Sequence, residues 1–315
     1  MSHLTVIAVD TGNKNIKTPH TEPFNAGVIK HGKTAPAISV DTLCLDGEFF
    51  SLTESRVPTM YDKTETNDYY ILTLFAIAKE LLVMEPGFGR YESDVCLALG
   101  LPPTHLQALQ KKYVAYFGHG GEKQHFTYNG IDFNIRIPRV EVFPQGYSAI
   151  VPFLAEIGQK PRSYIIDIGG YTTDVIQLQR GVPDMQFCES LNCGALRMFD
   201  QIKRALRNQY RFDADDYMVD CILRGNVSLD DEMKATAKEA AAEYAKNLIR
   251  SLEEMGVDLR LAYPVFIGGG ANLMKDVIVN EVKCKEFKCI DDVRANALGY
   301  AILAKGRLAK NNNAG

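Results

Sequence analysis

The chain has 315 residues, of which 46% are hydrophobic and 23% charged, and its formal net charge is −4. This length is about twice that of a typical domain, so the chain is expected to fold into two domains. The composition is that of a globular protein, and the lack of a basic excess argues against direct binding of DNA or RNA.

The chain carries no targeting or membrane signal that we can recognise. Its first residues lack a basic segment followed by an apolar one, and no apolar stretch reaches the roughly 18 residues of a membrane helix. We therefore expect a cytoplasmic protein without membrane contact. The seven cysteines are odd in number and never spaced C-x-x-C, which favours reduced thiols buried as small apolar groups. The pairs Cys188–Cys193 and Cys284–Cys289 leave a metal pair open.

The first elements form a strand, a turn and a second strand. A β-branched run at 4–9 leads into a glycine turn at 10–14, and an extended pattern resumes at 15–18. Rossmann and P-loop folds place a helix directly after such a turn, so neither is expected. Residues 31–68 are polar and irregular and are interpreted as an insertion. Short strands are expected within it at 37–45 and 48–52.

Strands and helices then alternate to the middle of the chain. Asn129-Gly130 joins two strand-like runs and favours a type I′ turn, because both positions need a positive φ. The patterns predict helices at 69–84, 105–117 and 145–157, and strands at 94–101, 125–128, 131–137 and 140–143.

The second half repeats the opening theme. A strand ends at Asp167, a glycine turn runs to Thr173, and a further strand follows. Asp10 and Asp167 lie 157 residues apart, and two copies of one hairpin predict two related domains. The remaining predictions are helices at 195–207, 230–255 and 293–308, a strand at 263–267 that opens onto a triple glycine at 268–270, and a disordered polar tail.

The three glycine turns together predict a nucleotide site. Each follows an apolar strand, where α/β sheets place their ligands, and glycines let backbone N–H groups approach a polyphosphate. Asp10 and Asp167 could hold the water shell of a magnesium ion, and Lys14 or Lys17 could neutralise the phosphates. In the third turn, Gly269 is expected to have a positive φ and to border the adenosine.

These segments resemble those of a known superfamily. VIAVDTGNKNIK (6–17), YIIDIGGYTTDVI (164–176) and VFIGGGAN (265–272) are similar to the two phosphate segments and the adenosine segment of actins, heat-shock chaperones and sugar kinases. LALGLPP, HFTYNGIDFNI, VEVFPQG and DDVRANALGYA follow in an order and spacing similar to the plasmid-segregating bacterial actins, the ParM or StbA group. Residues 31–68 and 208–232 are not matched securely.

The resemblance implies an α/β, actin-like (ribonuclease H-like) fold of duplicated domains that face each other across a nucleotide cleft. Domain I would span 1–158, with the helix at about 293–310 packed back on it. Domain II would span 159–292, with an insertion at about 208–256.

The resemblance also implies roles for single residues. Asp10 and Asp167 match the carboxylates that hold magnesium through water, Lys17 matches a phosphate-contacting lysine, and Gln145 matches the residue that orients the attacking water. Gln145 can orient a water but cannot accept its proton at neutral pH, and Glu141 is a less favoured substitute. The catalytic set is therefore Gln145, Asp167 and Asp10. The nucleotide-binding set is Asp10, Thr11, Gly12, Asn13, Lys14, Asn15, Lys17, Asp167, Gly169, Gly170, Tyr171, Thr172, Gly268, Gly269, Gly270 and Asn272. Contacts with the base are expected near Lys238 or Glu239. Asp174 either contacts the nucleotide or caps its own turn.

The function implied is that of an ATPase, or GTPase, that uses Mg²⁺ and polymerises with copies of itself into dynamic filaments. Such filaments would move plasmid DNA through an adaptor protein. The alternative is a non-polymerising small-molecule kinase or phosphatase of the same superfamily. A membrane-bound cell-shape actin is less favoured, because residues 307–313 are too short and polar for an amphipathic anchor.

Overall fold

The computed structural model describes residues 4–37, 41–87, 89–281 and 286–313. Contacts divide the chain into two compact units. Unit 1 comprises residues 1–152 together with 294–315, and unit 2 comprises residues 153–293.

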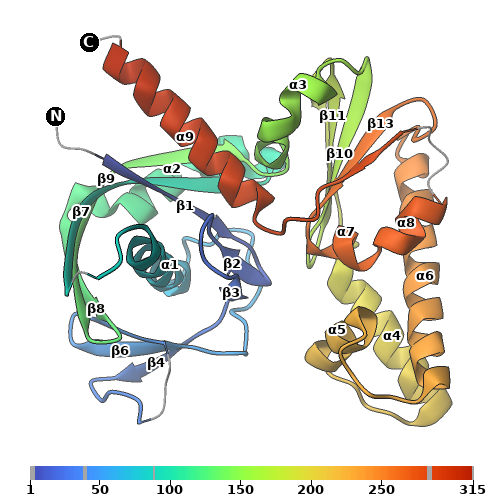
Figure 1. Ribbon diagram of the computed structural model, residues 1–315, viewed down its shortest axis with the longest axis horizontal. Helices are drawn as coiled ribbons and strands as arrows, with labels where there is room; N and C mark the ends of the chain where they lie inside the picture. Colours follow the sequence, from blue (N-terminus) through green and yellow to red (C-terminus); the bar gives the residue numbers. More distant parts are fainter. Residues whose placement is uncertain (1–3, 38–40, 88, 282–285, 314–315) are drawn as a thin grey trace. The chain divides into compact units, whose positions relative to one another are not determined.

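A mixed sheet forms the framework of unit 1, with the strand order β3-β2-β1-β7-β9-β8-β5-β6-β4 among the described residues (Figure 1). Strands β1, β7 and β9 run parallel, so their carboxyl ends share one edge of the sheet. At that edge Val9 pairs with Leu99, and Leu101 pairs with Pro144. The strands are β1 (Leu4–Thr11), β2 (Asn15–Lys17), β3 (Phe24–Asn25), β4 (Val28–Gly32), β5 (Thr42–Leu45), β6 (Glu48–Leu52), β7 (Arg90–Leu101), β8 (Lys123–Tyr128) and β9 (Ile131–Pro144).

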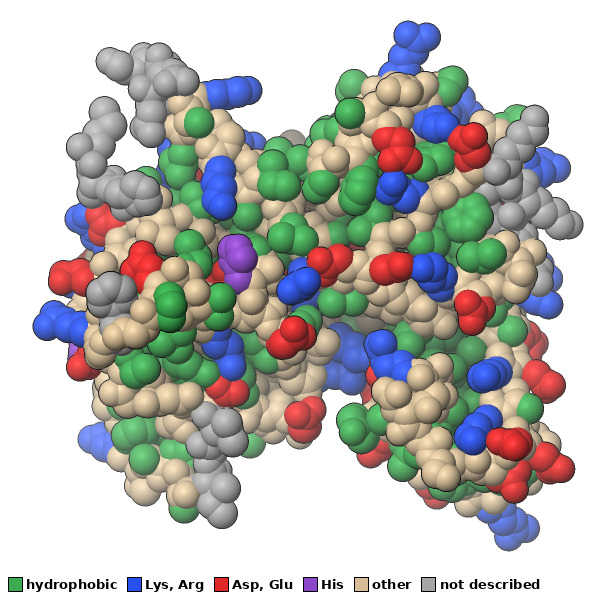
Figure 2. Space-filling model, viewed as in Figure 1, with side chains coloured by type: hydrophobic (Ala, Val, Ile, Leu, Met, Phe, Trp, Pro, Cys, Tyr) green, Lys and Arg blue, Asp and Glu red, His purple; other side chains and the backbone are tan. Residues whose placement is uncertain are grey.

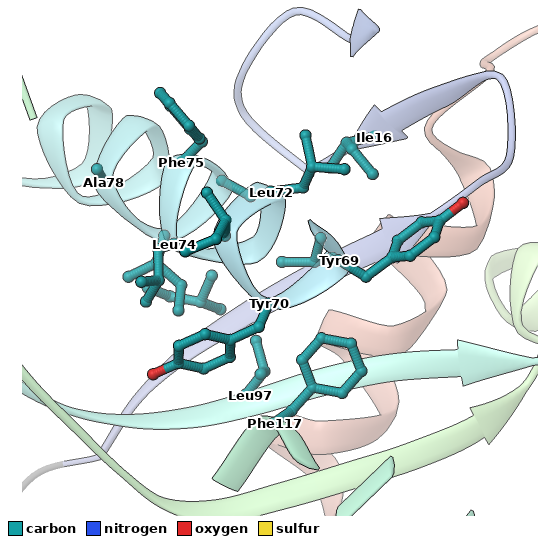
Figure 3. Close-up of a cluster of buried hydrophobic side chains, with 14 of the residues drawn as sticks. Ile16, Tyr69, Tyr70, Leu72, Leu74, Phe75, Ala78, Leu97 and Phe117 are labelled. Atoms are coloured by element: carbon teal, nitrogen blue, oxygen red, sulfur yellow. The ribbon is translucent and has the colours of Figure 1, made fainter. Parts of the chain in front are cut away.

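Helix α1 (Asp68–Met84) is the centre of the unit 1 core and lies inside the curve of the sheet (Figure 1). Every residue from Tyr69 to Ala78 is buried, as expected for a helix that is apolar on all sides. Its side chains pack against Ile16, Leu97 and Phe117 in one cluster (Figure 3).

The other helices of unit 1 pack on its strands. Helix α2 (Pro103–Gly118) packs on β9, and α9 (Ala295–Asn313) packs on β1 and β7. The Tyr300 ring of α9 lies so close to Gly100 that a Cβ there would be 1.9 Å from its hydroxyl oxygen. Short 3₁₀ helices lie at His119–Gly121 (η1) and Ser148–Phe153 (η2), and the last residue of the second is the first of unit 2.

Unit 2 is built on a smaller sheet with the order β12-β11-β10-β13-β14 (Figure 1). Strands β10 and β13 run parallel, so the turns that follow them lie at the same edge. Helices α4 and α6 pack on each other, and their apolar faces join the core of the unit. The elements are α3 (Leu154–Ile157), β10 (Arg162–Ile168), β11 (Thr173–Gln179), β12 (Val182–Leu191), α4 (Ala195–Tyr210), α5 (Asp216–Arg224), α6 (Asp231–Glu254), β13 (Tyr263–Ile267), α7 (Gly269–Leu273), α8 (Lys275–Glu281) and β14 (Lys288–Cys289).

The predicted α/β class is confirmed, and so is the Asn129-Gly130 turn, where φ is 50° and 80°. Three element predictions were wrong. The strands expected at 131–137 and 140–143 are one strand, because the register shift opposite β7 accommodates Pro138. The helix expected at 145–157 is a turn and then mostly 3₁₀ helix, since Pro152 cannot donate a helical hydrogen bond. The tail expected to be disordered is helical through Asn313, while residues 314–315 lie outside the described residues.

Two further points concern the cysteines and the membrane. Of the cysteines in the described ranges, Cys96 is buried and the others are half-buried, so the expectation of uniform burial was wrong. Cys284 lies outside the described residues. None of the described helices combines the length and apolarity that a membrane crossing requires.

Candidate functional site

The two acid-led turns occupy equivalent positions in their units. In unit 1, Asp10 pairs with Lys17 across the β1–β2 hairpin, one position before the last residue of β1. In unit 2, Asp167 pairs with Asp174 across the β10–β11 hairpin, again one position before the strand ends. Both acids are almost fully buried, at 4% and 5% exposure. The repeat seen in the sequence is therefore a repeat of structure, down to the position of the acid.

The first turn gathers three charged side chains. Lys17 Nζ lies 3.0 Å from Asp10 Oδ2. Lys63 Nζ donates a hydrogen bond to the Thr11 carbonyl oxygen and lies 4.7 Å from the centre of the Tyr69 ring. Burial, opposed by the charge of Asp10 and assisted by that of Lys17, lowers the pKa of Lys63 to about 8. The sequence analysis did not identify Lys63, because this residue lies in the stretch interpreted as an insertion. The spacing of Lys63 from the first turn gave no signal that it contacts that turn.

The other predicted residues of this turn are held by the backbone and by α1. The Lys14 carbonyl accepts from Ala26 N at 3.1 Å, and Asn13 Oδ1 accepts from the Tyr69 hydroxyl at 3.3 Å. Asn15 begins β2. Only glycine fits at position 12, because a Cβ there would lie 2.7 Å from the Asn15 carbonyl oxygen and 2.9 Å from Lys17 Nζ.

The second turn presents its amide groups as a set. The carbonyl oxygens of Gly169 and Gly170 accept from the backbone N–H groups of Ala195 and Leu196 at the start of α4, and the Tyr171 carbonyl accepts from Gly194, each at 2.9 Å. In a trans peptide the N–H points opposite to the C=O. The N–H groups of residues 170–172 therefore point away from α4. Such a run of amides is an anion-binding nest.

Gly194 is a residue of this site that sequence reasoning did not identify. A Cβ at Gly194 would lie 2.4 Å from the Gly170 carbonyl oxygen, so only glycine allows α4 to approach the turn. The Gly194 carbonyl accepts from the Tyr244 hydroxyl at 3.0 Å, which ties α6 to the same corner. The signal available in the sequence was a glycine directly before an amphipathic helix.

The third turn lies beside the second. Gly268 has φ 92° and ψ 163°, a conformation open to glycine almost alone, and a Cβ there would lie 2.6 Å from Asp167 Oδ1. The expectation that Gly269 has the positive φ was wrong, because the chain reverses one residue earlier and Gly269 already begins α7. A Cβ at Gly269 would meet no described atom within 4 Å, whereas one at Gly270 would lie 2.5 Å from Ile168. Asn272 donates to the Asp291 carbonyl at 2.6 Å, while its buried Oδ1 has no partner among the described residues.

Gln145 lies at the same edge of the unit 1 sheet as the first turn. It follows the last residue of β9, and its backbone N–H donates to the Leu101 carbonyl at 2.8 Å. The next residue, Gly146, has φ 77° and donates to Asn296 Oδ1 at 2.9 Å. The half-buried Gln145 is thus anchored by its main chain, and its side chain makes no hydrogen bond within the described residues.

The remaining candidates have other partners. Glu141 accepts hydrogen bonds from Arg139 and Arg307; burial alone would raise its pKa, but these bonds hold the pKa below its ordinary value. Glu141 is therefore an ion-paired carboxylate. Asp174 accepts from Ser190 on β12. Lys238 and Glu239 are exposed on α6, and their suggested contact with a base stays a prediction.

The residues present suit a nucleoside polyphosphate with magnesium. Amide nests and lysines attract phosphate oxygens, and the glycines leave room that a Cβ would fill. The unpartnered Asn272 Oδ1 can accept a hydrogen bond from a ligand. Within the described residues no three His, Cys, Asp or Glu side chains cluster as a metal site. Magnesium needs no such cluster, since it keeps several waters and takes one or two carboxylates plus phosphates.

Comparison with known families matches both units. The model of the actin-like protein N-terminal domain matches residues 44–147, and the model of the C-terminal part of the archaeal MreB-like actin homologue matches residues 165–280. No curated protein sequence matches the chain.

Solved structures give the same fold. The archaeal actin homologue Ta0583 in complex with ADP has a TM-score of 0.73 at 19% identity, over 96% of this chain and all of its own. A subunit of a 15-stranded ParM filament from Clostridium botulinum has a TM-score of 0.74 at 16% identity, over 97% and 100% of the two chains. The apo pSK41 ParM protein has a TM-score of 0.71 at 16% identity, over 99% of each. Models of actin-like domains therefore match residues in both units, and the chain shares the fold of ParM and of an archaeal actin homologue.

Proposed function

We propose that this protein binds ATP with magnesium, hydrolyses it, and uses the cycle to assemble and disassemble filaments of its own copies. The observation that carries the proposal is the equivalent placement of Asp10 and Asp167, each buried at the start of a glycine turn. The neighbouring structures support it, because one holds ADP and another is a ParM filament.

In this proposal the first two turns bind the phosphates. The amides of the Gly170–Thr172 nest and the ammonium of Lys17 contact phosphate oxygens, which requires Lys17 to be shared between Asp10 and the ligand. Asp10 and Asp167 would hold a magnesium ion through water, and the bound ion would supply positive charge beside the phosphates. The third turn receives the adenosine over Gly269. A Cβ added to this glycine would meet no described atom within 4 Å, so there is open space beside it.

Gln145 orients the attacking water in the proposed reaction. Its own backbone N–H and that of Gly146 are hydrogen-bonded, so the side chain is presented from a fixed main chain at the sheet edge. A glutamine cannot take the proton at neutral pH, so the proton passes to water or to a phosphate oxygen, and slow hydrolysis is expected.

The cellular role that we propose is the segregation of plasmid DNA through an adaptor protein. On the face drawn in Figure 2, Lys and Arg side chains are interspersed with Asp and Glu and form no broad basic patch. Direct binding of DNA needs such a local excess of positive charge. The formal net charge of −4 gives no basic excess over the whole chain either, so in this proposal an adaptor carries the basic surface that contacts DNA.

The test of the ATPase uses a matched pair of variants. Asp167→Ala is expected to lower magnesium-dependent phosphate release by roughly 100-fold or more, because the ion loses a carboxylate, while the fold survives. Asp184→Ala, at a partly buried carboxylate of β12 that accepts from Gln177 and Gln186 and is not a candidate site residue, should keep wild-type turnover. Phosphate release and a circular-dichroism melt are measured for both. Wild-type turnover in Asp167→Ala contradicts the assignment, and turnover that requires an added small-molecule acceptor identifies a kinase instead.

A further inference from the structure

The first and second turns present amides by different means. In the second turn, backbone N–H groups from α4 hold the turn's carbonyl oxygens, so that its amides point the other way. No helix follows the first turn, because β2 resumes at Asn15. Something else must hold the first carbonyl of that turn if its amides are to be presented in the same manner.

Lys63 occupies the position that this task requires. Its ammonium donates to the Thr11 carbonyl, and the peptide that carries this carbonyl also carries the Gly12 N–H. With the carbonyl held toward Lys63, the Gly12 N–H points away from it. The Tyr69 ring lies 4.7 Å from the ammonium, and the Tyr69 hydroxyl, which extends from α1 toward the β1–β2 hairpin (Figure 3), donates to Asn13.

The loop that carries Lys63 is itself fixed. Asp62, 5% exposed, accepts from Lys112 Nζ at 2.9 Å and from Thr64 N at 3.0 Å. The Thr66 carbonyl accepts from the Tyr116 hydroxyl at 2.7 Å. Both Lys112 and Tyr116 belong to α2. The contacts thus run from α2 through the loop to the first turn.

We propose that Lys63 is a positioning residue that fixes the first turn in the conformation that receives the nucleotide phosphates. The inference rests on the proposed function, because the direction of the Gly12 N–H matters only if this amide contacts a nucleotide phosphate. Lys63 acts through the Thr11 carbonyl, as the start of α4 does through the carbonyls of the second turn. A lysine suits a single carbonyl, since its ammonium is a compact donor on a flexible stem.

The experiment replaces Lys63 with Met, which keeps the length of the side chain and removes the donor. Lys79→Met is the control: Lys79 is also partly buried in unit 1, pairs with Asp41 at 2.8 Å and lies over aromatic rings, but touches no candidate site residue. Binding of a fluorescent ATP analogue with magnesium, amide hydrogen exchange of residues 10–17 in the nucleotide-free protein, and melting temperature are measured for both.

Lys63→Met is expected to weaken nucleotide binding about ten-fold or more and to speed exchange in residues 10–17, with other segments exchanging as in the wild type. Lys79→Met should change neither. Lys63→Arg keeps a charged donor and should recover most of the affinity; it also carries the test if the Met variant folds poorly.

Wild-type affinity in Lys63→Met overturns the positioning role and leaves the ATP-binding proposal standing. Equal loss in the Arg and Met variants, with unchanged exchange in residues 10–17, overturns it as well. If the wild-type protein binds no nucleotide while Lys63→Met still speeds exchange in the turn, the proposed function fails, and with it the purpose assigned to Lys63.

Discussion

A residue at one of the turns can be constrained for two separate reasons. Either the backbone conformation requires it, or a ligand needs the space beside it. Gly268 is constrained by the chain itself, because its φ of 92° and the nearby Asp167 carboxylate leave no room for a side chain. Gly269 has no such constraint, since a Cβ there would meet no described atom within 4 Å. If the third turn holds adenosine, the two glycines should respond differently to substitution.

Gly268→Ala is expected to destabilise the free protein by about 2 kcal/mol or more, because alanine is strained in this backbone region and its Cβ would clash. Gly269→Val should leave the melting temperature close to that of the wild type, yet weaken binding of an ATP analogue, because the valine side chain fills the space over the turn. Denaturant unfolding and analogue titration measure the two effects. Unchanged affinity in Gly269→Val would make this turn purely structural.

At the scale of elements, an ion-paired cluster fastens α9 to β9. Glu141 on β9 accepts from Arg139 and from Arg307 of α9, and the Arg307 guanidinium lies 4.4 Å from the centre of the Phe143 ring. The cluster joins segments 166 residues apart in the chain. It therefore contributes to keeping the terminal helix on the sheet that carries the first turn.

Replacing Glu141 with Gln should lower the free energy of unfolding by about 1 kcal/mol at neutral pH, because these ion pairs are partly exposed. The folded-state pKa of Glu141 is lowered, so its contribution is complete above the ordinary value of about 4.5 and is lost as pH falls through the lower folded pKa. Wild type and variant should therefore converge in strong acid. Glu92→Gln, at a more exposed pair with Lys123, is the control and should change stability less. Melting curves from pH 7 to pH 2 would refute this if the difference persisted in strong acid.

Elements with a clear local pattern could be predicted, and those set by distant contacts could not. Helix α1 and the Asn129-Gly130 turn follow from apolar periodicity and from the need for positive φ. Helix α5 was missed, because its nine residues make only about two and a half turns, too few to establish a helical period. The acids at the turns could be found because a strand and glycines mark them, whereas Lys63 and Gly194 act through partners far away in sequence.

In the whole molecule, the proposed nucleotide cycle controls self-assembly. A ligand shifts an equilibrium only by binding one state better than the other. If ATP binds the assembled state better, assembly should rise when ATP is added and fall as ATP is consumed. Gln145→Ala should keep nucleotide affinity but slow hydrolysis by roughly 100-fold, so its assemblies should last much longer than those of the wild type.

The most direct measurement is light scattering of the purified protein with magnesium and ATP, with ADP, or without nucleotide, alongside phosphate release, for the wild type and Gln145→Ala. Scattering is expected to rise with ATP and then decay in the wild type, to persist in Gln145→Ala, and not to rise with ADP or without nucleotide. Phosphate release without any rise in scattering, or an equal rise under all three conditions, would contradict the proposed nucleotide cycle.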